Sequence, residues 1–185
     1  GMKHYAFAGP RRVICAFTQR GMWSLAGLDV TTRELTPFVL PYTDIGAVQC
    51  DGSQAIFLAG SPTEPLSVVR LDLDSGRQET LRRSAGLAIP PAYLSTPEPV
   101  EFPTAGGRTA HGLFYPPRNP DFAAPQGESP PLIVMIHGGP TAATSTALRL
   151  NIQYYTSRGI AVLDVNYGGS TGYGRAYRER LYGGW

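Results

Sequence analysis

The sequence has little charge and no long apolar run. Charged residues make up 16% of the 185-residue chain and the net charge is +2, whereas soluble domains usually have roughly 25% charged residues. So small a positive surplus argues against a surface that follows nucleic-acid phosphates. No stretch reaches the ~18 consecutive apolar residues that a membrane helix needs. We therefore predict no nucleic-acid partner and no membrane partner.

Cysteine is also scarce. Cys15 and Cys50 are too few for a disulfide framework and lack metal-ligand spacing. Each lies in an apolar run, so we expect two buried, unpaired thiols. Residues 1–5 contain no apolar signal-peptide core, and Gly1 ahead of Met2 has the form of a residue left by tag cleavage. These features predict a cytoplasmic protein.

Glycine and proline, in contrast, are abundant, with 22 and 17 residues, and they indicate many tight turns between short elements. Up to residue 84 the chain has the pattern of short strands separated by turn signals. We expect strands at 12–17, 24–30, 55–59 and 67–73. Asp74-Ser75-Gly76 after the last one is a hairpin signal, in which Gly76 supplies a positive φ.

These strands form a repeat with a period of 43 residues. Residues 28–30 match residues 71–73, and residues 13–16 match residues 56–59 at the same offset. A repeat of about 40–45 residues made only of strands has the period of a β-propeller blade. We predict a partial β-propeller of about two blades at residues 1–84, which cannot close a ring alone. A plain antiparallel sandwich is the alternative.

After residue 84 the pattern changes. A proline-rich segment at 85–99 predicts a linker. Beyond it we expect a hairpin, a surface loop, a buried strand, a helix, a second buried strand and a second helix, at 100–115, 116–131, 132–136, 145–157, 160–165 and 175–181. The order strand–helix–strand–helix predicts a parallel α/β sheet in a second domain, residues 100–185.

In an open α/β sheet, functional loops follow the carboxyl ends of strands. His137-Gly138-Gly139-Pro140 directly follows the expected strand at 132–136. Glycines there allow a sharp turn and direct backbone N–H groups into a cleft. In α/β-hydrolases a loop of this type supplies an N–H of the oxyanion hole, which opposes charge on a carbonyl oxygen during acyl transfer. The alternative is an ordinary strand-to-helix turn.

A second glycine-rich loop, Tyr167–Gly174, contains Ser170 in a G-x-S-x-G pattern typical of a nucleophile elbow. We do not interpret Ser170 as the nucleophile. An elbow serine must be followed along the chain by an acid and a histidine, and neither Asp nor His follows Ser170. In addition, the strand before Ser170 is the first one after the loop at 137–140, whereas the nucleophile elbow of α/β-hydrolases comes one strand later. The glycine spacing does not fit a dinucleotide fingerprint.

Taken together, the motifs resemble the opening of a known catalytic domain. The resemblance is to the prolyl oligopeptidase family, especially its acylaminoacyl-peptidase and dipeptidyl-peptidase-like branch. The segments that carry it are His137–Thr141, the expected helix after them, Asn166–Arg175 and Arg180–Trp185. The motif resemblance covers about residues 130–185. It implies a mixed fold, with all-β propeller blades followed by the N-terminal part of an α/β-hydrolase parallel sheet. Gly168 departs from the family pattern, because many relatives carry Arg there.

The resemblance also implies a function. The chain would be a fragment of a serine peptidase that hydrolyses short or N-blocked peptides through an acyl-enzyme, without metal or cofactor. By the family pattern the nucleophile, acid and base lie beyond Trp185, so the 185 residues alone would be inactive. The positions that match are Gly139, as backbone donor to the oxyanion, and Gly138, as its conformational partner. The loop at 166–174 would support the cleft wall.

A non-catalytic binding module built from propeller blades is the second hypothesis. Open sheet edges pair readily with other chains, so we also expect a homodimer or a domain swap. His111 is expected to be a packed or surface histidine rather than a base. Arg175, Arg178 and Arg180 are expected to form the solvated face of a short helix.

Overall fold

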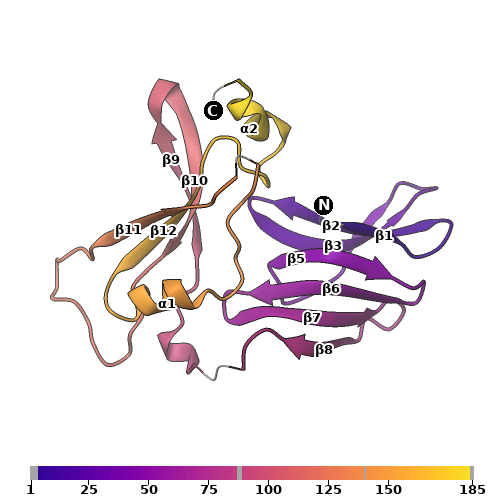
Figure 1. The fold of residues 1–185 in the computed structure, drawn as a ribbon, viewed down its shortest axis with the longest axis horizontal. Helices are drawn as coiled ribbons and strands as arrows, with labels where there is room; N and C mark the ends of the chain where they lie inside the picture. Colours follow the sequence, from indigo (N-terminus) through magenta and orange to yellow (C-terminus); the bar gives the residue numbers. More distant parts are fainter. Residues whose placement is uncertain (1–3, 87–88, 140, 184–185) are drawn as a thin grey trace. The chain divides into compact units, whose positions relative to one another are not determined.

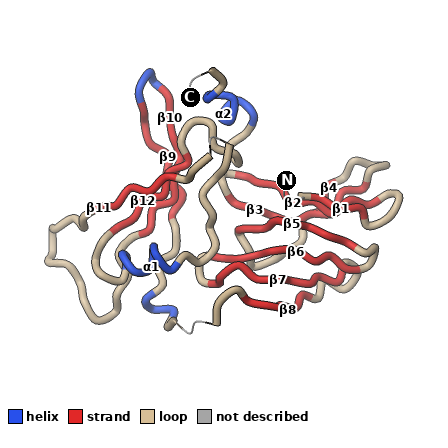
Figure 2. The backbone as a smooth tube through the Cα atoms, in the orientation of Figure 1, coloured by secondary structure: helices blue, strands red, loops and turns tan. Residues whose placement is uncertain are grey.

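Strands dominate the fold. Figure 1 shows a computed structural model that describes residues 4–86, 89–139 and 141–183. These residues form twelve strands and only two short α-helices (Figure 2). They divide into two compact units: one comprises the described residues up to 86 together with 146–148, and the other comprises the remainder. Among the described residues, no helix has the length and apolar character needed to span a bilayer.

The first unit contains two four-stranded antiparallel sheets. In each sheet, strands adjacent in sequence are adjacent in space, in the orders β1-β2-β3-β4 and β5-β6-β7-β8. The bounds are β1 (Tyr5–Phe7), β2 (Arg12–Gln19), β3 (Met22–Asp29), β4 (Leu35–Pro37), β5 (Asp44–Cys50), β6 (Gln54–Ser61), β7 (Glu64–Asp72) and β8 (Gln78–Arg83). All four strands expected from the sequence are present. Two successive four-stranded meanders are the form that propeller blades take.

The 43-residue repeat is visible in the turns that follow β3 and β7. Asp29 and Asp72 each accept hydrogen bonds from the backbone amides two and three residues later, at 2.7 and 2.9 Å and at 3.3 and 2.8 Å. These backbone hydrogen bonds hold the pKa of both carboxyl groups below its usual value. Four residues after each aspartate the backbone has a positive φ, 61° at Arg33 and 71° at Gly76. The two sheets are therefore copies of one structural unit.

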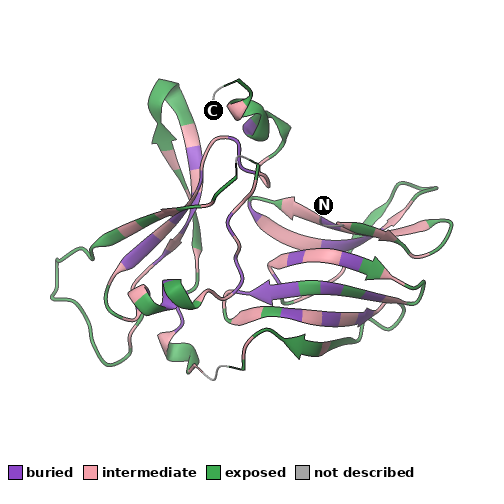
Figure 3. Ribbon diagram, viewed as in Figure 1, coloured by how far each residue is buried: buried purple, intermediate pink, exposed green. Residues whose placement is uncertain are grey.

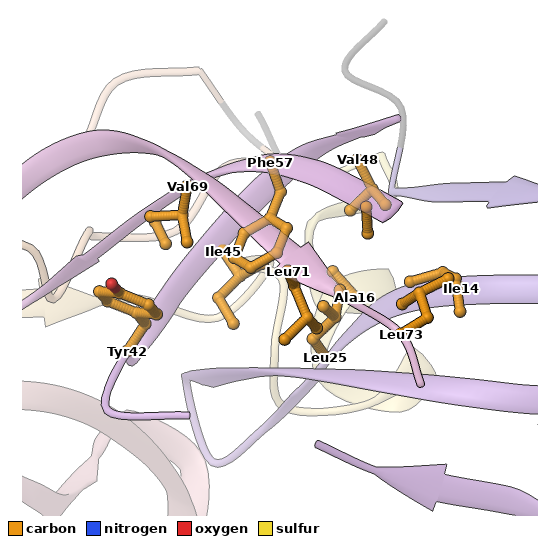
Figure 4. Close-up of a cluster of buried hydrophobic side chains, with 12 residues drawn as sticks. Ile14, Ala16, Leu25, Tyr42, Ile45, Val48, Phe57, Val69, Leu71 and Leu73 are labelled. Carbon is orange, nitrogen blue, oxygen red and sulfur yellow. The ribbon is translucent and has the colours of Figure 1, made fainter. Parts of the chain in front are cut away.

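The core of the first unit follows the alternation of strand side chains. In β6, Phe57 is buried at 1% exposure, whereas Ile56 and Leu58 on either side are 40% and 38% exposed. Figure 4 shows the cluster around Phe57, to which β2, β3, β5, β6 and β7 contribute. The expectation of two buried thiols is wrong: Cys15 and Cys50 are free and only half-buried. In strand β2, Cys15 is adjacent to inward-facing Ile14 and therefore points to the opposite face.

The second unit contains one mixed sheet with the order β11-β12-β10-β9. Its strands are β9 (Glu98–Thr104), β10 (Arg108–Tyr115), β11 (Leu132–Ile136) and β12 (Ala161–Asn166). β11 and β12 are parallel, as the strand–helix–strand pattern predicted. β10 pairs antiparallel with both β12 and β9. The β9–β10 hairpin therefore extends the same sheet, an attachment that the sequence pattern alone had left open.

Short helices connect and flank this sheet. They are α1 (Leu150–Thr156), α2 (Arg175–Arg178) and the 3-10 turns η1 (Pro91–Tyr93), η2 (Ala105–Gly107) and η3 (Glu179–Leu181). The segment expected to be a linker thus contains η1 and the start of β9. The proline-rich loop at 116–131 is largely exposed (Figure 3).

Helix α1 is shorter than the helix predicted at 145–157. Residues 146–148 are not helical and belong to the first unit, where the Thr146 hydroxyl donates to the Thr43 hydroxyl at 2.8 Å. Tertiary contacts therefore prevail over the helical spacing of these residues. The helix ends as predicted, because Gly159 takes a φ of 83° beyond its last turn.

Candidate functional site

The loop at 137–139 follows the carboxyl end of β11, and the loop at 167–174 follows the carboxyl end of β12. Because these strands are parallel neighbours, both loops leave the same edge of the sheet. Side chains of the second loop contact the first. The sheet thus brings together the two glycine-rich motifs that the sequence analysis identified separately.

In the described part of the chain, the two glycine amides of the first loop have no hydrogen-bond acceptor. Gly138 and Gly139 are exposed, and within the described residues neither backbone N–H donates a hydrogen bond. A Cβ atom at either position would meet nothing within 4 Å, so packing does not require glycine. Backbone conformation favours it at Gly139, where φ is 70°. Pro140 lies outside the described residues.

The carbonyl groups of this loop, in contrast, are bonded. The Tyr167 hydroxyl shares its one proton between the carbonyl oxygens of His137 and Gly139, at 3.3 and 3.1 Å. The Tyr167 ring also stacks on the His137 imidazole, with centroids 4.5 Å apart. One side chain therefore holds both the backbone and the side chain of the loop.

His137 and Ser170 are in direct contact. His137 Nε2 lies 2.7 Å from Ser170 Oγ, and His137 Nδ1 lies 3.3 Å from the carbonyl oxygen of Gly138. We assign the proton to Nδ1, because a carbonyl oxygen can only accept. Nε2 then accepts a hydrogen bond from the Ser170 hydroxyl. Ser170 is 0% exposed, so the contact lies beneath the surface.

The segment at 142–144 is held by β12 and by the loop that follows β12. The Thr171 amide donates to the carbonyl of Ala142 at 2.9 Å. Asn166, 1% exposed, accepts from the Thr144 amide at 2.9 Å and donates to the Tyr173 hydroxyl at 3.1 Å. The backbone at Ala142 and Thr144 is therefore held by Thr171 of the second loop and by Asn166, the last residue of β12.

A buried ion pair completes the attachment. Asp164 in β12 is 1% exposed and accepts hydrogen bonds from the Arg149 guanidinium and the Thr144 hydroxyl. The guanidinium also donates to the Thr144 hydroxyl at 3.3 Å. The carboxylate thus holds Thr144 and Arg149, two residues of the segment between the loop at 137–139 and α1.

The remaining candidates from the sequence, His111 and three arginines, have no contact with the loop at 137–139 among the described residues. His111 stacks on Tyr173 at 4.1 Å, and burial lowers the pKa of its imidazole. It is a packed histidine, as expected. Arg175, Arg178 and Arg180 are exposed, also as expected. No cluster of three or more His, Cys, Asp or Glu that could hold a metal ion occurs among the described residues.

Gly168, the departure from the family pattern, lies against Arg180. A Cβ at Gly168 would come within 3.3 Å of the Arg180 Cδ atom. Arg180 donates to the Thr109 carbonyl at 2.7 Å and lies 4.3 Å from the Tyr177 ring centroid. A side chain at position 168 would therefore compete with Arg180 for this space.

Comparisons with known proteins show that the chain is similar to members of a peptidase family. The model of the "Prolyl oligopeptidase family" matches residues 146–185. The chain is 36% identical to dipeptidyl aminopeptidase BIII of Pseudoxanthomonas mexicana over 90 residues, which cover 47% of this chain and 13% of that protein. It is similar in structure to a puromycin-hydrolysing peptidase of Mycobacterium tuberculosis, with a TM-score of 0.91, 45% identity and coverage of 98% of this chain and 28% of the other. A puromycin hydrolase structure matches with a TM-score of 0.89 and 42% identity, covering 100% of this chain and 28% of that chain.

The chain spans only about 13% of the length of the aminopeptidase and 28% of each puromycin-hydrolysing structure. Both structural matches extend over both units of the present chain, since they cover nearly all of it. The fold class predicted from the sequence, propeller blades followed by the first part of an α/β-hydrolase sheet, is confirmed by this similarity.

Proposed function

The chain belongs to the prolyl oligopeptidase family, and on that basis we propose that it carries the oxyanion loop of a serine peptidase. The observation that supports this is the pair of exposed Gly138 and Gly139 amides, which are left without a hydrogen-bond acceptor in the described part of the chain. They follow a parallel strand, where α/β enzymes place their functional loops. We place the nucleophile, acid and base in the part of the family fold that these residues do not span.

The reaction we propose is acyl transfer. A serine attacks the peptide carbonyl, and negative charge develops on the carbonyl oxygen in the tetrahedral transition state. The Gly139 N–H donates to that oxygen, and Gly138 allows the backbone to present it. One such donor is worth about 10²–10³ in kcat in well-studied serine peptidases. The loop thus contributes electrostatic stabilisation and no proton transfer.

Ser170 has no nucleophilic role in this proposal, although a histidine nitrogen lies 2.7 Å from its hydroxyl. The hydroxyl is 0% exposed, so a substrate carbonyl cannot approach it. The other nitrogen of His137 faces the Gly138 carbonyl at 3.3 Å rather than a carboxylate. A catalytic histidine needs an acid there to stabilise the imidazolium that forms.

The proposed substrates are short peptides, with a free or a blocked N-terminus. The names of the similar proteins, a dipeptidyl aminopeptidase and two puromycin-hydrolysing enzymes, favour substrates with a free amino end among these. We therefore propose an aminoacyl p-nitroanilide, its N-acetyl derivative, a dipeptidyl p-nitroanilide and puromycin as the first set to assay. We also propose a cytoplasmic location, since both cysteines are free thiols.

Labelling with a fluorophosphonate probe tests the proposal. We expect the full-length protein to react and the 185-residue chain to remain unlabelled. Ser170→Ala in the full-length protein should still be labelled when the reaction is followed to completion, because the covalent bond forms with the nucleophile and not with Ser170. Labelling of the 185-residue chain that disappears in Ser170→Ala would identify Ser170 as the nucleophile. A full-length protein that never reacts would exclude serine-peptidase chemistry.

An interaction module is the second candidate function. The observation that favours it is the edge strand β11, in which Leu132, Val134 and Ile136 are 50%, 59% and 70% exposed. An exposed apolar edge strand pairs readily with another chain. A full-length protein that binds partners but gives no fluorophosphonate labelling and no hydrolysis would support this function instead.

A further inference from the structure

We propose that Tyr167 and Ser170 are positioning residues that fix the direction of the two glycine amides in the loop at 137–139. This inference rests on the proposed function, because the amides matter only if they face a developing oxyanion. It goes beyond it by assigning the task of orienting the donors to two side chains of a different loop. Neither side chain reaches the reacting atoms in this account.

The planar peptide bond links each carbonyl group of the loop to the amide that follows it. No cis peptide bond occurs in the described residues, and in a trans peptide the C=O of one residue and the N–H of the next point in opposite directions. Whatever holds a carbonyl oxygen therefore also determines where the following amide hydrogen points. In the loop at 137–139 the carbonyl groups are held, whereas the amides of Gly138 and Gly139 have no acceptor among the described residues.

Tyr167 orients the first amide. Its hydroxyl donates to the His137 carbonyl oxygen at 3.3 Å, so the N–H of Gly138 points away from Tyr167. The same hydroxyl donates to the carbonyl of Gly139 at 3.1 Å and so holds the far end of the loop. A phenylalanine at position 167 would keep the stacking on His137 and lose both hydrogen bonds.

Ser170 orients the second amide through His137. The Gly138 carbonyl faces His137 Nδ1 at 3.3 Å, so the N–H of Gly139 points away from the imidazole. The imidazole keeps that orientation because Ser170 Oγ lies 2.7 Å from its Nε2 and Tyr167 stacks on its face. Ser170 is fully buried and so provides a fixed anchor.

The test is a set of single-hydroxyl deletions in the full-length enzyme. Displacing a preorganised donor by about 1 Å can cost on the order of 10²-fold in rate, and removing it costs 10²–10³-fold. We expect Tyr167→Phe and Ser170→Ala each to lower kcat by roughly 10-fold or more with KM changed less than about two-fold. Affinity for a peptide boronate, which mimics the tetrahedral state, should fall in parallel, while affinity for the product peptide stays constant.

Tyr173→Phe is the matched control. It removes a hydroxyl from the same loop, which is bonded to Asn166 and, within the described residues, has no contact with residues 137–139. We expect its kcat to stay within about two-fold of wild type. Equal losses of kcat in Tyr173→Phe and Tyr167→Phe, or unchanged kcat in both Tyr167→Phe and Ser170→Ala, would overturn the inference.

Crystal structures of the wild-type and Tyr167→Phe enzymes separate this inference from the proposed function. We expect the His137–Gly138 peptide to rotate in the variant, with its carbonyl no longer directed at position 167. An unrotated peptide would refute the positioning role even if the enzyme is active. A rotated peptide in a protein without hydrolase activity would retain the structural role and reject the peptidase proposal.

Discussion

The substitution Gly139→Ala tests whether the backbone conformation of the glycine loop is used for catalysis. At Gly139 φ is 70°, a region in which an L-residue is disfavoured by roughly 1–2 kcal/mol. A Cβ there meets nothing within 4 Å, so no steric clash adds to this strain. Alanine also keeps the backbone N–H, so any change in activity comes from a change in its direction.

Gly127→Ala provides a control with the same local cost. Gly127 lies in the exposed loop at 116–131 with a φ of 87°, and a Cβ there also meets nothing within 4 Å. Both substitutions should therefore lower the free energy of unfolding by a similar amount, about 1 kcal/mol. Urea unfolding of the full-length protein measures this. Only Gly139→Ala should affect the reaction.

The expected loss of activity follows from the same strain. If the loop relaxes to a negative φ, the strain is relieved and the amide turns away from the oxyanion. A preference of about 1.4 kcal/mol for the relaxed form corresponds to roughly a tenfold lower kcat. Steady-state hydrolysis of an aminoacyl p-nitroanilide measures it. Wild-type kcat in Gly139→Ala, or an equal fall in Gly127→Ala, would refute the reasoning.

Three further predictions concern stability and association. Tyr115→Phe should raise the free energy of unfolding by about 1 kcal/mol, because the buried Tyr115 hydroxyl has no hydrogen-bond partner in the described residues. Burial raises the pKa of Tyr115 from 10.0 to about 12. Between these two pH values the hydroxyl is ionised in the unfolded chain but still protonated in the folded one, so the free energy of unfolding of the wild type should decline as pH rises from 10 to about 12. Urea unfolding measures this, and the variant should show no such decline from this group. Arg149→Met leaves Asp164 buried without its cation and should lower the free energy of unfolding; because the arginine side chain is 32% exposed, we expect a loss of about 2–3 kcal/mol. Arg158→Met is the control and should change the free energy of unfolding little. Equal losses in the two variants would contradict the ion-pair argument. Val134→Lys on the exposed edge strand should reduce self-association of the 185-residue chain in analytical ultracentrifugation, and an unchanged dimer fraction would argue against that edge as the contact.

Much of the fold could be predicted because its signals are local. Alternation of apolar residues is visible in β6, where Phe57 is buried between exposed Ile56 and Leu58. The turn after β7 has a positive φ at Gly76, and glycine is the residue that adopts this conformation most readily. The repeat could be detected because Leu28-Asp29-Val30 matches Leu71-Asp72-Leu73, and Asp29 and Asp72 form the same local turn in each sheet. Each of these features depends on residues only a few positions apart.

Other features depended on contacts between distant segments and could not be predicted. The helical spacing around Leu148 did not produce a helix there, because residues 146–148 pack into the first unit. The half-buried state of Cys15 depends on which face of β2 meets the core. Such outcomes are set by the partners that a segment finds across the fold, and a local pattern does not contain them.

The sequence by itself determined that a glycine loop would follow a parallel strand, since glycine and strand are neighbours in the chain. It could not reveal that the Tyr167 hydroxyl holds the His137 carbonyl at 3.3 Å, or that Ser170 meets the His137 imidazole 33 residues away. Only the parallel pairing of β11 with β12 brings these groups to one edge of the sheet. The direction of a backbone amide depends on what holds the neighbouring carbonyl, and that partner comes from another strand.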